Sequence, residues 1–150
     1  MRVVIDTNIL IGGAYDENSY SYKIIREVIS GRLMAFATHK TMRENKTLLG
    51  QAVTDSNYRE LLESYFRRLQ IVRRKERLDV ISDKEDNKLF ESAVAADADF
   101  LITNDREVLD VEEFAGAAVV TPEEFWTKYK AKSEPEDKPW RDWINQVMGG

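Results

Sequence analysis

The chain has 150 residues, of which 43% are hydrophobic and 33% are charged, as is typical of a soluble globular protein with one domain. It has no cysteine and one histidine, His39, which excludes a disulfide framework, a thiolate zinc site and a cysteine nucleophile and argues against a histidine-rich metal site. No apolar run is long enough to cross a bilayer and no charged-then-apolar leader is visible, so we expect a cytoplasmic protein without a membrane partner. The net charge of −5 excludes a generally basic surface for nucleic acid, but not a nuclease whose own carboxylates bind cations.

The first element is predicted from an apolar run, residues 3–5, which continues directly into Asp6, Thr7 and Asn8. A short unbroken apolar run is typical of a strand buried on both faces of a parallel sheet. Ligands bind at the carboxyl ends of such strands, and a carboxylate removed from water is costly without a partner. We therefore expect Asp6 to bind a divalent metal together with acids from later in the chain.

Helical and strand patterns alternate along the rest of the chain. A polar loop at 12–19 is followed by a helix at 20–30, a strand at 33–37, a helix capped by Thr38, a helix beginning at Asp55 or Ser56, and a short strand at 71–72. A capping box at 82–85 then opens a helix at 86–98, and a strand at 100–102, a helical turn at 106–109, a strand at 117–120 and a helix from Pro122 to about Ala131 complete the pattern. Because no hairpin signal separates the strands, the pattern predicts a three-layer α/β/α fold with a central parallel sheet.

The carboxyl-terminal stretch has a different composition. We expect residues 1–132 to form one domain, and residues 133–150 to form a charged linker with two prolines and then a short amphipathic helix. Five apolar residues recur there at helical spacing: Trp140, Trp143, Ile144, Val147 and Met148. This stripe must be buried on the body of the same chain or on another, so a homodimer is one of two expectations.

Four acidic residues share a position close to the carboxyl edge of the predicted sheet: Asp6, Glu44, Asp86 and Asp105. Each alone has an ordinary explanation as a turn, surface or helix-capping residue. Asp6 and Asp105 directly follow buried strands. Glu44 and Asp86 lie in helices that begin at the same edge. Asp97 is roughly 16 Å beyond Asp86 along a helix, so it belongs to the opposite edge, together with Asp99.

Carboxylates gathered at one edge repel each other strongly unless cations neutralise them. Ligation by oxygen alone suits Mg²⁺ or Mn²⁺ rather than zinc. Such sites catalyse phosphoryl transfer, because the cation activates a water and stabilises charge on the attacked phosphate. The four acids therefore predict a metal-dependent phosphoryl-transfer site.

Five segments of the chain resemble motifs of the PIN-domain family of metal-dependent nucleases. They are Val4–Asn8, Thr38–Glu44, Asp83–Lys88, Leu101–Asp105 and, in one bacterial and archaeal branch, Thr121–Phe125. The likeness covers about residues 1–130. It implies a parallel sheet between helices, with a Mg²⁺- or Mn²⁺-dependent ribonuclease activity. Many relatives of this size are toxins of VapC-like toxin–antitoxin pairs, so RNA and an antitoxin protein are the implied partners.

The resemblance also implies roles for individual residues. The catalytic and metal-binding acids would be the four already named: Asp6, Glu44, Asp86 and Asp105. Asn8, Thr103 and Asn104 would support these acids or face the phosphate, although Asn104 stands where the family often has glycine.

Basic residues cluster from Arg67 to Arg77, although the whole chain is acidic. Arg73 and Arg74 in this cluster are candidates for RNA phosphate contacts, as are Lys40 and Arg43. The ordinary explanation of the cluster is a solvated helix end.

The main alternative to a nuclease is a catalytically inactive PIN-fold module that binds RNA or protein. A haloacid-dehalogenase-type phosphatase would need a second acid where Asn8 stands. A response-regulator receiver would need a phosphoacceptor aspartate at a middle strand, and a dinucleotide-binding protein would need a glycine-rich turn that this sequence does not have.

Overall fold

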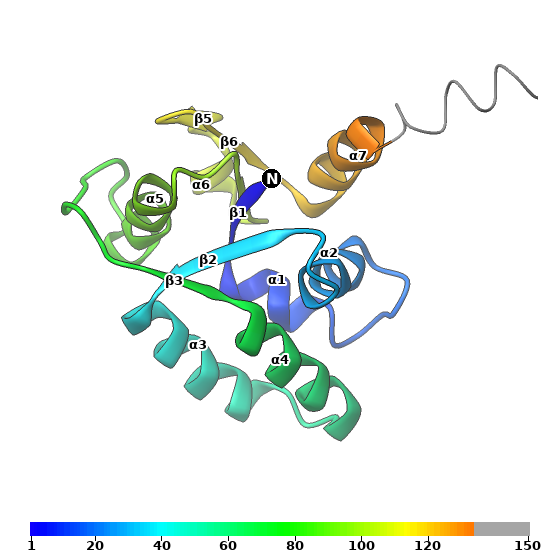
Figure 1. Ribbon diagram of the computed structural model, residues 1–150. Helices are drawn as coiled ribbons and strands as arrows, with labels where there is room; N and C mark the ends of the chain where they lie inside the picture. The colour runs from blue at the N-terminus through cyan, green and yellow to red at the C-terminus, as the bar shows by residue number, and fades with distance from the viewer. Residues whose placement is uncertain (134–150) are drawn as a thin grey trace, which may run out of the picture.

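The computed structural model describes residues 1–133, which form one six-stranded sheet between two layers of helices (Figure 1). The strands are β1 (Arg2–Ile5), β2 (Met34–Thr38), β3 (Gln70–Val72), β4 (Phe100–Ile102), β5 (Glu113–Phe114) and β6 (Ala117–Val120). The helices are α1 (Thr7–Gly12), α2 (Tyr20–Ile29), α3 (His39–Ala52), α4 (Ser56–Arg68), α5 (Lys84–Ala96), α6 (Arg106–Leu109) and α7 (Pro122–Ser133). The three-layer α/β/α fold predicted from the sequence is confirmed.

The sheet has the strand order β3-β2-β1-β4-β6-β5, with β1 near its centre. The first five strands of this order run parallel, and Val3 of β1 lies opposite Ala35 of β2 and Phe100 of β4. All of these strands therefore end at one edge of the sheet. Asp6 and Thr103, which directly follow β1 and β4, are neighbours at that edge.

The core lies on both faces of the sheet, because the side chains of a strand alternate between faces. Val3 and Ile5 pack toward α2, α4 and α7, where Ile24, Leu62 and Phe125 contribute fully or nearly fully buried side chains: these residues belong to one apolar cluster. Val4 packs on the other face in a second cluster, which includes Phe90 and Ala93 of α5 and Val108 of α6. Figure 1 shows α5 on one side of β1 and α2 and α7 on the other. Burial on both faces explains why the strands are uninterrupted apolar runs.

A hairpin at one edge of the sheet was not predicted. β5 pairs antiparallel with β6 through a turn at Ala115 and Gly116, whose φ angles are 51° and 87°. Tight hairpins of this kind are normally signalled by Asn-Gly or Asp-Gly, since both turn residues need positive φ. Ala115 adopts that conformation without the usual sequence signal, so the sequence did not predict the antiparallel strand β5 beside the parallel strands.

Two helix boundaries also differ from the prediction. α1 was not predicted, since no element was assigned between the strand at 3–5 and the loop at 12–19; Asp6 caps this helix by accepting a hydrogen bond from the Asn8 N–H group. α5 begins at Lys84 and is capped by Asp83, whereas the hydroxyl of Ser82 donates a hydrogen bond to another segment of the chain. The helix therefore starts two residues before the predicted start at 86, and Asp83 rather than Ser82 is its cap.

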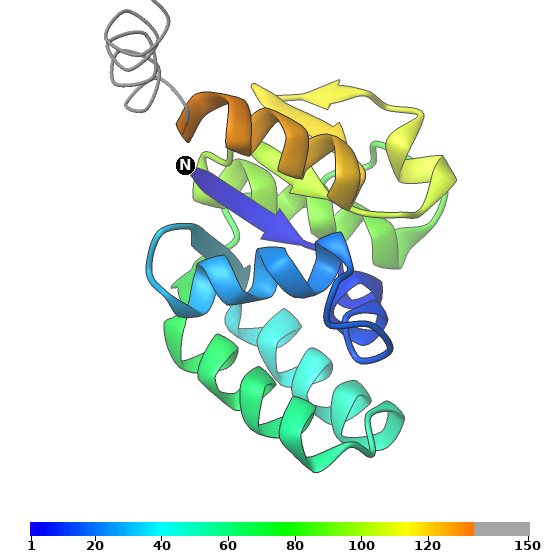
Figure 2. The same ribbon diagram turned by 90° about the vertical axis from the view of Figure 1, so that its right-hand side faces the viewer.

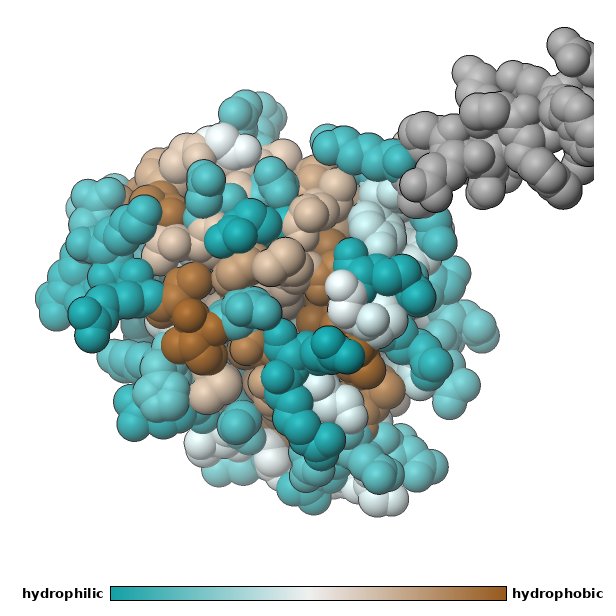
Figure 3. Space-filling view, in the orientation of Figure 1, coloured by the Kyte–Doolittle hydropathy of each residue, from teal (hydrophilic) through white to brown (hydrophobic). Residues whose placement is uncertain are grey.

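The surface of the described residues is polar with scattered apolar side chains, as Figure 3 shows for the face along which β2 and β3 run. Met34 of β2 and Ile71 of β3 are 40% and 47% exposed. No helix within residues 1–133 is long and apolar enough to span a membrane. The predicted linker and amphipathic helix lie, from residue 134 onward, outside the described residues.

Candidate active site

Asp6 lies where β1 ends and α1 begins. Its side chain is largely buried, and its Oδ2 atom accepts a hydrogen bond of 2.8 Å from the hydroxyl of Thr103. Thr103 is fully buried after β4, and its hydroxyl oxygen accepts the N–H group of Asp105 at 3.0 Å. A single hydroxyl group thus connects two of the predicted acids across adjacent parallel strands.

The pKa of Asp6 is raised above its ordinary value, chiefly because burial disfavours the charged carboxylate. The hydrogen bonds from Thr103 and from the backbone of Asn8 lower the pKa, but the nearby charge of Asp105 raises it further. No cation contributes to the balance. Asp6 is therefore a buried acid whose main charged neighbour is another acid.

Asp86 lies in the first turn of α5, immediately after the cap formed by Asp83. The pKa of Asp86 is raised to about 7. The largest cause is burial, and the rise is increased by the charges of Asp105, Asp83 and Asp6 and by a hydrogen bond with Asp105. Asp105 itself caps α6. The structure therefore brings Asp6, Asp86 and Asp105 within electrostatic reach of one another at the carboxyl edge of the sheet.

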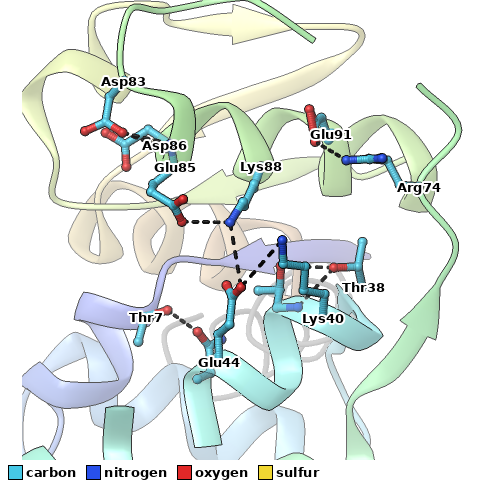
Figure 4. Close-up of polar contacts among 12 residues, drawn as sticks. Thr7, Thr38, Lys40, Glu44, Arg74, Asp83, Glu85, Asp86, Lys88 and Glu91 are labelled. Carbon is cyan, nitrogen blue, oxygen red and sulfur yellow. Dashed lines mark hydrogen bonds and ion pairs between the residues drawn. The ribbon is translucent and has the colours of Figure 1, made fainter. Parts of the chain in front are cut away.

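Glu44 reaches this edge from α3, but its carboxylate is paired with cations. Its Oε1 atom lies 3.7 Å from the ammonium group of Lys88 and 3.9 Å from that of Lys40. Lys88 extends from α5 and also donates a 2.8 Å hydrogen bond to Glu85, as Figure 4 shows. Glu44 thus ties α3 to α5 and is not among the charges that shift the pKa of Asp6 or Asp86.

α3 is held at this edge by one contact that the sequence predicted and by one that it did not. Thr38 caps the helix by accepting the Thr41 N–H group at 3.2 Å, as predicted. In addition, the hydroxyl of Thr7 donates a hydrogen bond to the side chain of Asn45, which is buried on the inner side of α3. No local sequence pattern signals this contact, because Thr7 and Asn45 are 38 residues apart in the chain.

The irregular segment at 73–82 is fastened to α5. The buried side-chain amide of Asn87 accepts the N–H groups of Val80 and Ile81 and donates to the carbonyl of Ile81, all at 2.9–3.0 Å. The buried carboxylate of Glu91 accepts the Leu78 N–H group at 3.0 Å and lies 3.6 Å from the guanidinium of Arg74. Arg74, a candidate for RNA contact, therefore has a structural partner.

The remaining predicted residues lie at the surface. Asn8 and Asn104 are exposed next to Asp6 and Asp105, and Arg73 is exposed in the segment after β3. Lys40 and Arg43 line a hollow of about 500 Å³ along α3, together with Glu44. The structure thus groups Lys40 and Arg43 with Glu44 and places Arg73 and Arg74 on a different segment.

The donor set at the carboxyl edge suits a hard divalent cation. Asp6, Asp86 and Asp105 offer oxygen ligands alone, and burial together with neighbouring acids raises the pKa values of Asp6 and Asp86. Within residues 1–133, however, no three His, Asp or Glu side chains already stand in positions that would hold a metal ion. The aspartates fit Mg²⁺ or Mn²⁺ by chemistry, and cation binding would require their side chains to draw together.

Comparison with known families agrees with this fold and site. The model of the PIN domain matches residues 2–107, and the chain belongs to the PIN-domain family. PIN domains are generally nucleases, so family membership supports a nuclease.

Among solved structures, a chain from the crystal structure of VapBC2 from Rickettsia felis bound to a DNA fragment from their promoter is similar, with a TM-score of 0.53. The alignment covers 81% of this chain and 98% of that chain at 13% sequence identity, which shows a shared fold. No curated protein gives a significant match to the sequence.

Proposed function

We propose that this protein is a Mg²⁺- or Mn²⁺-dependent endoribonuclease and acts as the toxin of a toxin–antitoxin pair. The observation that carries the proposal is the gathering of Asp6, Asp86 and Asp105, whose mutual repulsion contributes to the raised pKa values of Asp6 and Asp86. Structural carboxylates are normally paired with cations or hydrogen-bond donors, whereas strongly perturbed acids at a strand edge are candidates for catalysis.

Asp6, Asp86 and Asp105 would hold the cation, which lowers the pKa of a bound water and stabilises charge on the phosphate. Thr103 fixes the Asp6 carboxylate through its 2.8 Å hydrogen bond. Asp86 exchanges its proton near neutral pH, because its pKa is about 7, so its capacity to bind a cation rises as the pH passes through that value.

Glu44 would contribute to the site by one of two routes. It joins the aspartates if it leaves Lys88 and Lys40, or it keeps Lys88 positioned beside the substrate phosphate. Lys40 and Arg43 lie next to it along α3 and would contact neighbouring phosphates of the RNA. Asn8 and Asn104, both exposed beside the acids, would face the substrate.

The toxin role rests on the family and on the fold shared with a chain of the VapBC2 structure. An antitoxin protein is the partner this role requires. A catalytically inactive RNA- or protein-binding module is the second candidate, and the ion pairs of Glu44 with Lys88 and Lys40 favour it, since they occupy one of the four predicted acids.

The experiment that separates these candidates combines a Mn²⁺ titration with cleavage of single-stranded RNA. We expect Mn²⁺ to raise the melting temperature of the native protein, and RNA cleavage to require added cation and to stop in chelator. Asp86→Asn should lose both responses, whereas Asp97→Asn, at the far end of α5, should keep them. A native protein that shows neither response to Mn²⁺ would favour the binding module.

A further inference from the structure

A hollow of about 520 Å³ lies between α3 and α4, and none of the four predicted acids lines it. Leu49 and Leu62 form its buried floor, and Phe66 is half-buried beside them. Concave sites of this size hold ligands with several rings, and apolar floors favour apolar occupants. The site of RNA cleavage proposed above does not use this hollow.

The rim of the hollow is basic. Lys46, Arg59 and Arg67 line it against a single carboxylate, Glu63. The ammonium of Lys46 lies 5.5 Å from the centre of the Phe66 ring, and Arg67 is 3.9 Å from Glu63 in an exposed ion pair. Because the whole chain has a net charge of −5, this rim has the opposite sign to the molecule. Its chemistry suits an occupant with aromatic or aliphatic side chains and an acidic flank.

Residues 134–150 of the chain have that chemistry in their sequence. Four acids precede or accompany the first apolar residues: Glu134, Glu136, Asp137 and Asp142. Two bases, Lys138 and Arg141, leave this part of the segment negative. The apolar residues at helical spacing include Trp140 and Trp143.

The position of α7 decides which copy of the chain supplies the segment. α7 ends on the side of the molecule opposite α3 and α4, as both views show (Figure 1, Figure 2). The six residues 134–139 span at most about 20 Å when fully extended. A second copy can place its own segment in the hollow without crossing the molecule, and two copies can do so reciprocally, as in a two-fold symmetric dimer.

We propose that residues 134–150 of one copy dock in the α3–α4 hollow of a second copy. Trp140 and Trp143 cover Phe66, and the acids of the segment face Lys46, Arg59 and Arg67. The exchange of two such segments makes a homodimer whose stability depends on both the apolar contact and the charge pairing.

The first test measures the mass of the full chain in solution by light scattering after gel filtration. The native protein should be a dimer. Two variants should each weaken dimerisation at least tenfold: Trp140→Ser/Trp143→Ser in the segment, and Arg59→Glu/Arg67→Glu on the rim. Lys23→Glu/Lys128→Glu, which changes as much charge away from the hollow, is the matched control and should stay dimeric.

Mixing the two defective variants distinguishes exchange between copies from docking within one copy. The rim variant keeps an intact segment, and the tryptophan variant keeps an intact hollow, so their mixture should form a heterodimer with one native contact. Adding Glu136→Lys/Asp137→Lys to the rim variant should restore the homodimer, because the charges of the rim and of the segment are then both reversed and remain opposite in sign.

Three outcomes would overturn the proposal. They are a native protein that is monomeric at all concentrations, a dimer that survives loss of both tryptophans, and a mixture in which no heterodimer forms. A rim variant that loses affinity for single-stranded RNA while remaining dimeric would assign the hollow to nucleic acid instead.

Discussion

The carboxylates at the two edges of the sheet have different kinds of neighbours. At the amino edge, Glu27 lies 2.6 Å from Arg32 and accepts a hydrogen bond from Tyr129, while Asp99 accepts the N–H group of Arg2 at 2.8 Å. At the carboxyl edge, Asp6 and Asp86 have other carboxylates as their charged neighbours. The first arrangement stabilises the fold, and the second stores repulsion that a bound cation can relieve.

The pKa values record this difference. Burial acts to raise the pKa of Glu27, but the hydrogen bonds from Arg32 and Tyr129 and the charge of Arg32 outweigh it, so the pKa is lowered. Burial raises the pKa of Asp6 and Asp86, and neighbouring acids add to the rise. Similar burial thus gives opposite shifts, because the partners differ in sign.

The largest expected effect comes from Asp6. Asp6→Asn should reduce RNA cleavage by more than about 100-fold and abolish the Mn²⁺-dependent rise in melting temperature, whereas Thr103→Val, which removes only a supporting hydroxyl, should reduce metal affinity about 10–100-fold. Thr103→Ser keeps the hydroxyl and should behave like the native protein. Calorimetric titration with Mn²⁺ measures both variants, and an Asp6→Asn protein with native affinity would remove Asp6 from the site.

The second effect concerns stability without metal. The folded-state pKa of Asp86 is raised to about 7, so burial of its charged form, together with repulsion from neighbouring acids, destabilises the fold progressively as the pH rises from about 4 to 7. Asp86→Asn should remove this loss and raise the melting temperature by about 2–4 °C at pH 8, a value discounted because the carboxyl is only partly buried. The gain should vanish near pH 4. A gain that does not depend on pH would contradict the assignment of repulsion to this carboxylate.

The third effect should have the opposite sign. Glu27→Gln weakens the pairing with Arg32 at the amino edge and should lower the free energy of unfolding by about 1 kcal/mol at pH 7. Because the folded-state pKa of Glu27 is lowered, its contribution is present above the ordinary value of 4.5 and is lost as the pH falls through the folded-state value. Urea unfolding of both proteins should therefore show a smaller difference at pH 3 than at pH 7.

The smallest effect concerns the ion pair that holds Glu44. Lys88→Met removes the shorter of the two ion pairs of Glu44 and should tighten Mn²⁺ binding on the order of threefold, while the free energy of unfolding changes by less than about 0.5 kcal/mol. Lys84→Met removes the same charge from an exposed position on α5 and is the control. Equal effects of the two substitutions would mean that Glu44 does not compete for the cation.

Much of the fold was readable from the sequence because its strands are buried on both faces. The runs ending at Ile5 and Ile102 are apolar for that reason, and each leads directly into the polar residues of the edge. The hairpin at Ala115 escaped prediction because its positive φ is imposed by the pairing of β5 with β6 and not by a turn residue.

The candidate site was predictable only at the level of the backbone. Parallel strands place Asp6 and Asp105 at the same edge whatever their side chains do. The partner of Glu44 depends on side-chain positions, since Lys88 is 44 residues further along the chain and reaches it only after α3 and α5 are packed. The hydrogen bond between Thr7 and Asn45 likewise joins segments whose proximity no local pattern encodes.

The hydrogen bonds that attach segment 73–82 to α5 affect the susceptibility of the chain to proteolysis. The segment carries four exposed basic residues after β3: Arg73, Arg74, Lys75 and Arg77. Each is a site for trypsin, yet cleavage requires an extended, detachable backbone, and one amide side chain and one carboxylate on α5 hold this stretch in place. Loss of both the Asn87 amide and the Glu91 carboxylate would expose this stretch to trypsin, which would then cut the chain in two.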